Sequence, residues 1–364
     1  MHVNLRKEVD ESYDISIEPN LLERISHDLK TSPLGNKYAI VTDSNVRDLY
    51  GERLLKSLKK EGMNACLLDF PAGERSKNME TVTPLIGGLL ENGLDRKSAV
   101  IALGGGVVGD VAGFTASIFM RGIPCIQVPT TLLAQVDSSI GGKTAVDTAE
   151  GKNLVGLFFQ PKRVYIDPAV LNTLPKREFA NGLAEVIKHG IIGDGEFFRF
   201  LEENITKIKK MDPEPLTRAI WVSCKIKKEV VEEDPKEENK RAILNYGHTV
   251  GHAIEAYGGY KKYLHGEAVA IGMNYAGRLA VKKGFWREDE LERQNRLLKE
   301  ASLPIQCDLD PEEIIEKMSH DKKAEAGAIM FVLPKGIGEM ATVKGRYRIP
   351  VSNEELMSIL KEKK

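Results

Sequence analysis

The amino-acid sequence predicts an α/β domain built on a parallel sheet, followed by a mostly α-helical domain. Up to about residue 167, apolar runs of strand length alternate with amphipathic helical patterns, which is typical of a parallel sheet covered by helices. Beyond that point helical periodicity dominates, and strand-like runs are scarce until 328–334. We therefore predict domains at residues 1–170 and 171–364, joined by a hinge at 167–175, where prolines flank a short turn.

The first domain is expected to carry at least four strands, each ending in a possible ligand-binding turn. The apolar runs that predict these strands lie at 37–46, 63–74, 98–106 and 122–134, and helical patterns lie at 46–62 and 78–93. Parallel sheets of this kind bind ligands at the carboxyl ends of their strands. Asp43, Glu74 and the glycines around Gly104 all lie at such ends, so we expect a ligand there.

The second domain is expected to consist mainly of amphipathic helices. Five segments show apolar residues at helical spacing, and they lie at 171–192, 195–210, 216–234, 265–284 and 287–303. Ligands often bind in the crevice between two domains, so we expect a site that uses both halves of the chain and a closure movement on binding.

Composition excludes several classes of protein. With 52 basic and 53 acidic side chains the 364-residue chain has a formal net charge of -1, so no global field favours nucleic acid or a membrane surface. Its four cysteines form no CxxC pair, which argues against a zinc ribbon and fits a reducing compartment. The N-terminal segment lacks the apolar core of a signal peptide, and the apolar segment 98–120 is interrupted by Asp110 and five glycines. We therefore expect a cytoplasmic protein with no membrane span.

Two stretches of the first domain have the composition of anion-binding loops. LGGGVVGDVAG, at 103–113, follows a strand and opens a helix, so its backbone amides could approach a phosphate, although tight strand–helix packing is the alternative. It matches neither GxGxxG nor a Walker motif. Gly-Lys steps place Lys143 and Lys152 in polar loops of small residues, where they could contact an anionic substrate or remain solvated. Asp137 is a candidate acid or base, with a helix cap as the alternative.

The helix at 180–192 carries a carboxylate in an apolar setting. Glu185 and Lys188 lie three residues apart and share a helical face, as a surface ion pair would. Apolar residues surround Glu185 on several sides, however, and a buried carboxylate needs a partner. Further along, Arg241 and Asn245 have helix-like spacing with His248, which gathers a cation, an amide and an imidazole on nearby faces.

Three histidines in the segment 243–272 suggest a metal centre. His248 and His252 lie one helical turn apart, and His265 follows a Gly-Gly break that lets the chain turn back. There is no HExxH motif. Two of the three histidines with a carboxylate from Glu185 or Glu267 would leave a coordination position open for substrate. Histidines that merely fill the interior are the alternative.

These motifs, in their order along the chain, resemble the 3-dehydroquinate synthase family. Any one of them is weak, but the ordered set is very specific, and it covers about residues 40 to 275 densely. The segments that carry the resemblance are GERSK (73–77), GGGVVGD (104–110), MRG (120–122), PTTLLAQVDSSIGGKTAVD (129–147), GKN (151–153), GLAEVIKHG (182–190), LNYGHTVGHAIE (244–255) and HGEAVAIGM (265–273).

The resemblance implies a fold and an activity. The fold is a Rossmann-like N-terminal domain that binds NAD and a helical C-terminal domain that holds a divalent metal, usually Zn²⁺ with Co²⁺ also suitable, in a homodimer. The activity is that of a carbon–oxygen lyase of the shikimate pathway, which makes 3-dehydroquinate and phosphate from the sugar phosphate 3-deoxy-D-arabino-heptulosonate 7-phosphate. Transient oxidation by NAD, phosphate elimination, re-reduction, ring opening and an intramolecular aldol step account for the reaction. NAD is recycled in it.

The resemblance also implies roles for individual residues. The metal ligands are Glu185, His248 and His265. The catalytic residues are Asp137, Lys143, Lys188, Lys227, Asn245 and His252. The substrate-binding residues are Arg121, which reaches the partner subunit's site, Lys143, Lys152, Asn153, Lys188, Lys227, Arg241, Asn245 and His252. The NAD-binding residues are Asp43, Asn45, Glu74, Lys77, Gly105, Gly106, Val107, Asp110, Thr130, Thr131, Asp137, Ser138, Lys143 and Lys152. A C-terminal lysine of the family corresponds to Lys322 or Lys323.

Several alternatives remain open on the sequence. Sugar phosphate cyclases that make aminocyclitol or valiolone precursors are related, but their substrates lack the carboxylate that Arg241 and Lys227 would suit. Aminodehydroquinate synthases differ by one heteroatom in the substrate. A metal-dependent polyol dehydrogenase would release NADH stoichiometrically. A catalytically inactive binding protein is disfavoured because four expected site residues are all present, namely Lys143, Lys188, His248 and His265.

Overall fold

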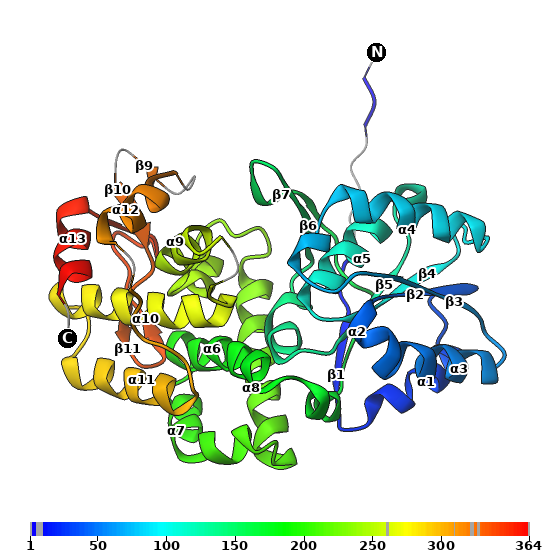
Figure 1. Cartoon of the computed structure of the whole chain (residues 1–364), viewed down its shortest axis with the longest axis horizontal. Coiled ribbons are helices and arrows are strands. Elements are labelled where there is room, and N and C mark those ends of the chain that lie inside the picture. The colour runs from blue at the N-terminus through cyan, green and yellow to red at the C-terminus, as the bar shows by residue number, and fades with distance from the viewer. Residues whose placement is uncertain are drawn as a thin grey trace. The chain divides into compact units, whose positions relative to one another are not determined.

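The computed structural model of the chain describes residues 2–4, 10–259, 262–308, 310–320, 324–325 and 328–362. The chain divides into two compact units (Figure 1). The first comprises Met1–Thr130 and Ser138–Asp167, and the second comprises Thr131–Asp137 and Pro168–Lys364. The short segment Thr131–Asp137 therefore packs with the helical unit although it lies within the α/β part of the sequence. Among the described helices, none is long and apolar enough to cross a bilayer.

The first unit is built on a six-stranded, fully parallel sheet. Its strand order is β1-β8-β5-β4-β2-β3. The strands are β1 (Asp14–Ile17), β2 (Lys37–Asp43), β3 (Asn64–Phe70), β4 (Ala99–Gly104), β5 (Cys125–Pro129) and β8 (Arg163–Ile166). The four expected strands, β2 to β5, are confirmed, whereas β1 and β8 were not foreseen. The chain reverses its winding direction between β2 and β4, and ligands of such sheets bind at that point.

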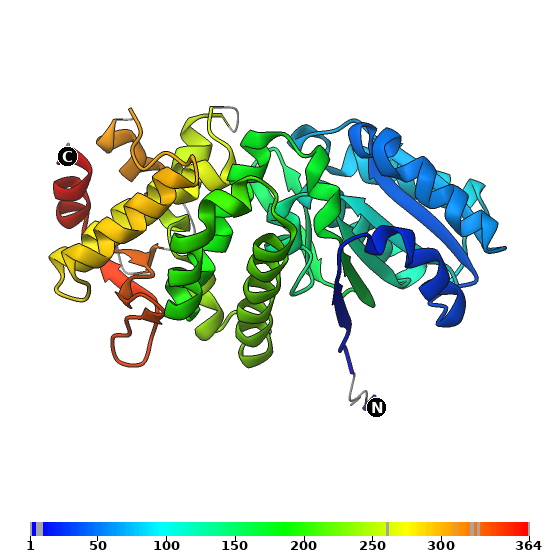
Figure 2. The same cartoon turned by 90° about the horizontal axis from the view of Figure 1, so that it is seen from below.

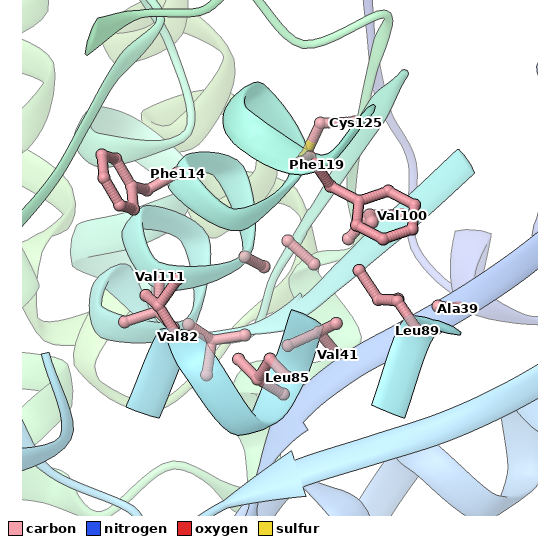
Figure 3. Packing of buried hydrophobic residues seen from close by; sticks show 14 of the residues in the cluster. Ala39, Val41, Val82, Leu85, Leu89, Val100, Val111, Phe114, Phe119 and Cys125 are labelled. Carbon is pink, nitrogen blue, oxygen red and sulfur yellow. The ribbon is translucent and has the colours of Figure 1, made fainter. Parts of the chain in front are cut away.

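Helices cover both faces of this sheet. Figure 1 shows α4 and α5 on one face and α1 and α3 on the other. Their bounds are α1 (Ile25–Thr31), α3 (Glu52–Lys60), α4 (Met79–Glu91) and α5 (Gly106–Ile118), with short turns α2 (Ser44–Val46), η1 (Leu21–Glu23), η2 (Arg47–Gly51), η3 (Glu74–Ser76) and η4 (Phe119–Arg121). The core under α4 and α5 packs Val82 and Leu85 against Val41 and Val111 (Figure 3). Burial of these aliphatic side chains fixes the loops at the strand ends.

The expected loops around the two Gly-Lys steps are instead an antiparallel hairpin, so that prediction was wrong. Lys143 begins β6 (Lys143–Thr148), and Lys152 lies in β7 (Gly151–Phe158). Thr144 and Val146 are buried at alternate positions, which is the strand period of two. Their run is short and mixed with small polar residues, so it lacks the apolar continuity that revealed the central strands.

The second unit is mostly helical, as expected. Its helices are α6 (Lys176–Gly193), α7 (Gly195–Lys209), α8 (Pro213–Glu233), α9 (His248–Tyr257), α10 (His265–Lys282), α11 (Glu288–Glu300), α12 (Pro311–His320) and α13 (Asn353–Lys361). Figures 1 and 2 show α6 to α11 gathered in one helical body. The remaining elements are η5 (Ala134–Ser138), η6 (Pro168–Thr173), η7 (Lys240–Asn245), β9 (Ala324–Glu325), β10 (Ala328–Phe331), β11 (Pro334–Gly336), β12 (Glu339–Met340) and β13 (Ile349–Val351).

Helices α9 and α10 approach each other through glycines. A Cβ atom on Gly272 would lie 1.9 Å from the carbonyl oxygen of Gly247. Replacement of Gly272 by Ala is therefore expected to force the helices apart and to lower the free energy of unfolding by about 3 kcal/mol, the upper end of the cost of overpacking. Urea denaturation measures this. Gly87→Ala is the matched control, because a Cβ there meets nothing within 4 Å, and it should stabilise the chain by roughly 0.5–1 kcal/mol.

Candidate active site

Helix α6 places a charged pair inside the second unit. Glu185 is fully buried and Lys188 is 1% exposed, and the two side chains form an ion pair. Lys188 Nζ also donates a hydrogen bond to the carbonyl oxygen of Leu244 at 2.8 Å. The helix is buried on nearly every face from Phe179 to Ile192, because it is apolar on several sides. The pair therefore lies in the interior and is not the surface ion pair that the spacing alone would also allow.

Two histidines from neighbouring helices face Glu185. His248 begins α9 and His265 begins α10, and their ring centroids lie 5.1 Å apart. Nε2 of His248 is 3.6 Å from Glu185 Oε1, and Nε2 of His265 is 3.8 Å from the same oxygen. All three residues offer ligand atoms that lie within 4.8 Å of one another. Two imidazoles and a carboxylate at this spacing suit a Zn²⁺-type cation with a coordination position left open.

The hydrogen bonds of both imidazoles leave Nε2 ready to bind a cation. Nδ1 of His248 lies 3.1 Å from the carbonyl oxygen of Tyr246, and Nδ1 of His265 lies 3.2 Å from Glu255 Oε2. Carbonyl and carboxylate oxygens only accept, so each Nδ1 carries the proton and each Nε2 has a lone pair. Oε1 of Glu185 is buried and accepts no hydrogen bond among the described residues, whereas Oε2 pairs with Lys188. The residues present therefore fit a divalent metal.

The protonation preferences of the two histidines differ. Burial, and then the charge of Lys188, hold the pKa of His248 well below its ordinary value, so this imidazole stays neutral. Burial also lowers the pKa of His265, but the hydrogen bond and charge of Glu255 and the charge of Glu185 outweigh burial and raise it. The negative charges of Glu185 and Glu255 thus favour a positive charge on His265, at the same set of residues where a metal cation would bind.

The second candidate carboxylate, Glu267, points elsewhere. Both of its oxygens accept hydrogen bonds from Arg177, at 2.7 and 2.8 Å, and one also accepts the backbone N–H of Leu264 at 2.9 Å. Glu267 thus closes the first turn of α10. Of the two carboxylates that the sequence offered, Glu185 is the one that meets the histidines.

The start of α10 is held against α6 by close backbone contact. The N–H of Gly266 donates to Asn181 Oδ1 at 2.5 Å, and a Cβ on Gly266 would lie 2.0 Å from the Asn181 carbonyl oxygen. Only glycine allows this approach, which brings His265 to Glu185.

Two other groups of possible ligands lie nearby. His252, Glu255 and His265 form one, and Asp137, Glu185 and His189 form the other. In the second group Lys227 already pairs with Asp137, whereas Glu185 is shared with the set that contains His248 and His265. Burial and the charge of Lys188 hold the pKa of His189 well below its ordinary value. The set Glu185, His248 and His265 is therefore the best candidate for a cation.

Asp137 and Lys227 form a second interior ion pair. Lys227 Nζ donates to both the carboxylate and the backbone oxygen of Asp137. Burial alone would raise the pKa of Asp137, but the charges of Lys227 and Lys188 outweigh it and hold that pKa well below its ordinary value. Burial lowers the pKa of Lys227 despite its partner. The carboxylate stays ionised beside an amine that releases its proton more readily than usual.

Arg241 and Asn245 lie in the turn η7. The Arg241 side chain is 2% exposed and donates from Nη1 to the carbonyl oxygen of Pro235 at 2.7 Å. Asn245 Nδ2 donates to Glu237 Oε1 at 2.7 Å. The electrostatic influence of Arg241 and Lys188 on Lys227 shows that these three cations share one region. Such a cluster suits an anionic substrate group.

In the first unit, several of the residues assigned to NAD lie at carboxyl ends of the parallel strands. Asp43 ends β2, and its Oδ1 accepts the N–H groups of Asn45 at 2.9 Å and Val46 at 3.0 Å. Gly105 precedes α5, whose first turn holds Gly106 and Val107, and Thr130 follows β5 and donates its N–H to the Gly104 oxygen at 2.9 Å. A Cβ on Gly106 would lie 3.2 Å from Ser138 Oγ.

A charged network joins the hairpin to two of these loops. Lys77 Nζ pairs with Asp110 Oδ2 and donates to Asn153 Oδ1, both at 2.5 Å. Lys152 Nζ pairs with Glu74 Oε1 at 2.9 Å. Burial raises the pKa of Asp110, and Lys77 only partly offsets this effect. The structure thus brings five expected site residues together within one unit.

The Lys77–Asp110 pair should be strongly coupled. Replacing Lys77 by Met leaves the Asp110 carboxylate, 17% exposed, without its main counter-charge, and we expect a loss of about 3 kcal/mol in the free energy of unfolding. The double variant Lys77→Met/Asp110→Leu should recover most of this loss. Urea denaturation of the two single variants and the double variant measures the coupling, and simple additivity would contradict it.

The other expected site residues have these places. Arg121 is exposed, with φ of 70° after Met120 with φ of 51°, and Lys143 is exposed at the start of β6. Thr131 Oγ1 accepts the N–H of Ala134 at 3.1 Å. His252 lies on α9, 5.4 Å from His248 between ring centroids. Lys322 and Lys323 lie outside the described residues.

Sequence reasoning missed three residues that support these sites. Glu255 contacts His265, Asn181 contacts Gly266, and Asp147 accepts the N–H of Asn153 at 2.9 Å. Helical spacing could have revealed Glu255, which lies three residues after His252. Nothing local distinguishes Asn181, because its partner is 85 residues away, and Asp147 contacts Asn153 only through the hairpin that the sequence did not reveal.

Family profiles match residues 67–324, and a curated relative matches almost the whole chain. A profile described as 3-dehydroquinate synthase N-terminal matches residues 67–181, and one described as 3-dehydroquinate synthase C-terminal matches residues 182–324. A curated protein named 3-dehydroquinate synthase, from Desulforamulus reducens, is 49% identical over 353 residues. The match covers 96% of this chain and 97% of that relative.

Solved structures of two sugar phosphate cyclases share the fold. A 2-deoxy-scyllo-inosose synthase complexed with carbaglucose-6-phosphate, NAD⁺ and Co²⁺ has a TM-score of 0.88 and 30% identity, covering 96% of each chain. The 2-epi-5-epi-valiolone synthase ValA from Streptomyces hygroscopicus subsp. jinggangensis, with NAD⁺ and Zn²⁺ bound, has the same TM-score and identity, covering 99% of this chain and 98% of that one.

Proposed function

The chain belongs to the 3-dehydroquinate synthase family, and on that premise we propose that it converts 3-deoxy-D-arabino-heptulosonate 7-phosphate into 3-dehydroquinate and phosphate. This makes it a carbon–oxygen lyase acting on a phosphate ester. The observation that carries the proposal is the convergence of Glu185, His248 and His265 in the interior of a chain that matches its relatives over nearly its full length.

Two cofactors fit the residues present. Glu185, His248 and His265 would hold Zn²⁺ or Co²⁺, and the related cyclases whose solved structures carry NAD⁺ with one of these metals support this assignment. When bound, NAD would accept and later return a hydride at the substrate's carbinol carbon, and the metal would act on its hydroxyl group as a Lewis acid. Gly105 and Gly106, at the N-terminus of α5, would hold the pyrophosphate of NAD through their backbone N–H groups.

The chain's own residues bind and orient the substrate anions. Lys188, Lys227 and Arg241 are buried cations, and they suit the phosphate and carboxylate of the substrate. Asn245 would position a hydroxyl group beside them. Lys143, Lys152 and Asn153 would add contacts from the hairpin β6–β7. The substrate is flexible and passes through several chemical steps, so catalysis depends largely on residues that keep it in a reactive orientation.

Proton transfer falls to the groups beside the metal centre. The pKa of Asp137 is held well below its ordinary value, chiefly by Lys227 against the effect of burial, so this carboxylate stays ionised and would hold Lys227 in position for proton transfer. Lys227, whose pKa burial lowers, would return protons, and His252 on α9 would contact the reacting hydroxyl groups. These roles complete the catalytic set Asp137, Lys143, Lys188, Lys227, Asn245 and His252.

We also place the activity in the cytoplasm and in a homodimer. Arg121 supports the dimer, because its exposed side chain stands on backbone with positive φ, an unfavourable conformation that persists where a function requires it. In a dimer, Arg121 would serve the partner subunit's site.

Phosphate release tests the function. The purified chain is supplied with the heptulosonate 7-phosphate and catalytic NAD, before chelation, after chelation and after Zn²⁺ is added back. We expect phosphate release coupled to dehydroquinate formation, lost on chelation and restored by Zn²⁺. Net accumulation of NADH would instead indicate a dehydrogenase.

A sibling cyclase activity is the second candidate. The two solved cyclases at 30% identity favour it, since their overall fold is the same. Against it, Arg241 and Lys227 are buried cations suited to a carboxylate, which the sugar phosphates of those cyclases lack. Turnover of a carboxylate-free heptulose phosphate, with no release from the heptulosonate, would establish that alternative.

A further inference from the structure

A carboxylate stands directly behind the second histidine of the metal centre. Glu255 lies on α9, and its Oε2 is 3.2 Å from Nδ1 of His265 on α10. Its side chain is only 10% exposed. A buried carboxylate is retained where it has a partner, and here that partner is an imidazole whose other nitrogen faces Glu185 at 3.8 Å.

The contact decides which nitrogen of His265 carries the proton. An ionised carboxylate can only accept, so the hydrogen bond fixes the proton on Nδ1 and directs the Nε2 lone pair toward Glu185. His248 is held in the same tautomer by a different partner, the backbone carbonyl of Tyr246 at 3.1 Å. The two imidazoles therefore donate to different kinds of acceptor. Nδ1 of His248 donates to a neutral carbonyl group, whereas Nδ1 of His265 donates to a negatively charged carboxylate.

We propose that Glu255 is a positioning residue that orients His265 and makes it the more basic of the two imidazole ligands. Metal-binding histidines whose second nitrogen donates to a carboxylate gain both a fixed orientation and greater basicity. Helix α9 thus contributes His248 as one ligand and, two turns later, the carboxylate that holds the other. The inference rests on the metal centre of the proposed function.

A second cation between His252, Glu255 and His265 is the competing arrangement. These three residues also offer atoms within 4.8 Å of one another. In that case the Nδ1 of His265 would have to lose its proton, and one imidazole would bridge two cations. Metal stoichiometry separates the two arrangements, because the positioning role requires one metal per chain.

Zn²⁺ affinity tests the proposal without reference to catalysis. The full-length chain and its Glu255→Ala and Glu255→Gln variants compete with a chromophoric chelator for Zn²⁺, and Co²⁺-loaded samples give visible spectra. We expect Glu255→Ala to bind Zn²⁺ about 10–100-fold more weakly and to show an altered Co²⁺ spectrum. Glu255→Gln should lie between it and the wild type, because an amide oxygen still accepts the Nδ1–H but carries no charge.

The control is Glu267→Gln. Glu267 lies two residues from His265, but its carboxylate pairs with Arg177 and not with an imidazole. The Zn²⁺ affinity of the Glu267→Gln variant should stay within about twofold of the wild type. NAD affinity, measured by calorimetry, should be the same in all four proteins if they are equally folded.

Three results would contradict the proposal that Glu255 positions His265. Wild-type affinity in Glu255→Ala, with one metal per wild-type chain, would refute the positioning role and leave the metal centre intact. Two metals per wild-type chain, with one lost in the variant, would establish the competing arrangement. A wild-type chain that binds no Zn²⁺ would refute the metal centre and the role together.

Discussion

Replacing Glu185 by Gln is expected to remove bound metal and, with it, phosphate release. The carboxylate is fully buried, its Oε1 lies 3.6 and 3.8 Å from the two imidazole nitrogens, and its Oε2 pairs with Lys188. A neutral amide of the same shape cannot balance the charge of a divalent cation. We expect Zn²⁺ affinity to fall by more than about 100-fold, since loss of an outer partner of a ligand already costs roughly 10–100-fold.

The metal content of the purified variant and a chelator competition measure this effect. Glu178→Gln is the matched control on the same helix, because Glu178 accepts a hydrogen bond from Asn181 at 3.2 Å and an amide can still do so. It should retain metal and activity. Full zinc content in Glu185→Gln would contradict the metal centre, whichever substrate the chain acts on.

Replacing Lys227 by Met is expected to damage both stability and activity. The change leaves the Asp137 carboxylate without the cation that touches it, in a region where Lys188 is its next counter-charge. Breaking a buried pair costs about 3–5 kcal/mol, and the 26% exposure of the Asp137 side chain argues for the lower end, near 3 kcal/mol. Phosphate release should also fall, since the substrate anions lose a buried cation.

The stability loss should depend on pH. In the wild type the folded-state pKa of Asp137 is below its unfolded value, so its stabilising contribution is present above about pH 4 and is lost as pH falls further. Without Lys227, burial raises that pKa and a neutral carboxyl becomes tolerable in acid. The difference in unfolding free energy between wild type and Lys227→Met should therefore be largest near pH 7 and shrink toward pH 4.

Urea denaturation at both pH values measures this difference. The Lys228→Met variant is the control, because Lys228 is exposed on the same helix and pairs with Glu232 at 2.8 Å. Exposed pairs contribute little, so the control should lose less than about 1 kcal/mol. A pH-independent difference for Lys227→Met would show that lost packing, and not the charge of Asp137, causes the instability.

Much of the architecture could be predicted because the signals are local. The central strands β2 to β5 are continuous apolar runs, and each is bounded by glycine or a turn cluster. The helices of the second unit show their period directly, and the four-residue spacing of His248 and His252 places both on one face of α9. Local periodicity was enough for these features.

Other features depended on contacts between segments that are remote in sequence. Strands β1 and β8 and the hairpin β6–β7 are short and mixed in composition, so they form only because neighbouring strands supply their hydrogen bonds. The segment Thr131–Asp137 packs with the helical unit, which brings Asp137 to Lys227, 90 residues away. No local pattern carries that information.

The sequence by itself determined the fold class, the helical face that carries two histidines, and a choice of carboxylates for a metal. Tertiary structure decided which of the two carboxylates meets the histidines. The close approach of α10 to α6 at Gly266 brings His265 to Glu185, whereas Glu267 forms an ion pair with Arg177. The helical period of the sequence indicates which residues share one face of a helix. Which faces contact one another is determined by the packing of the helices in the folded chain. The contact between Glu255 and His265 likewise depends on the packing of α9 against α10 and could not be predicted from the helical period.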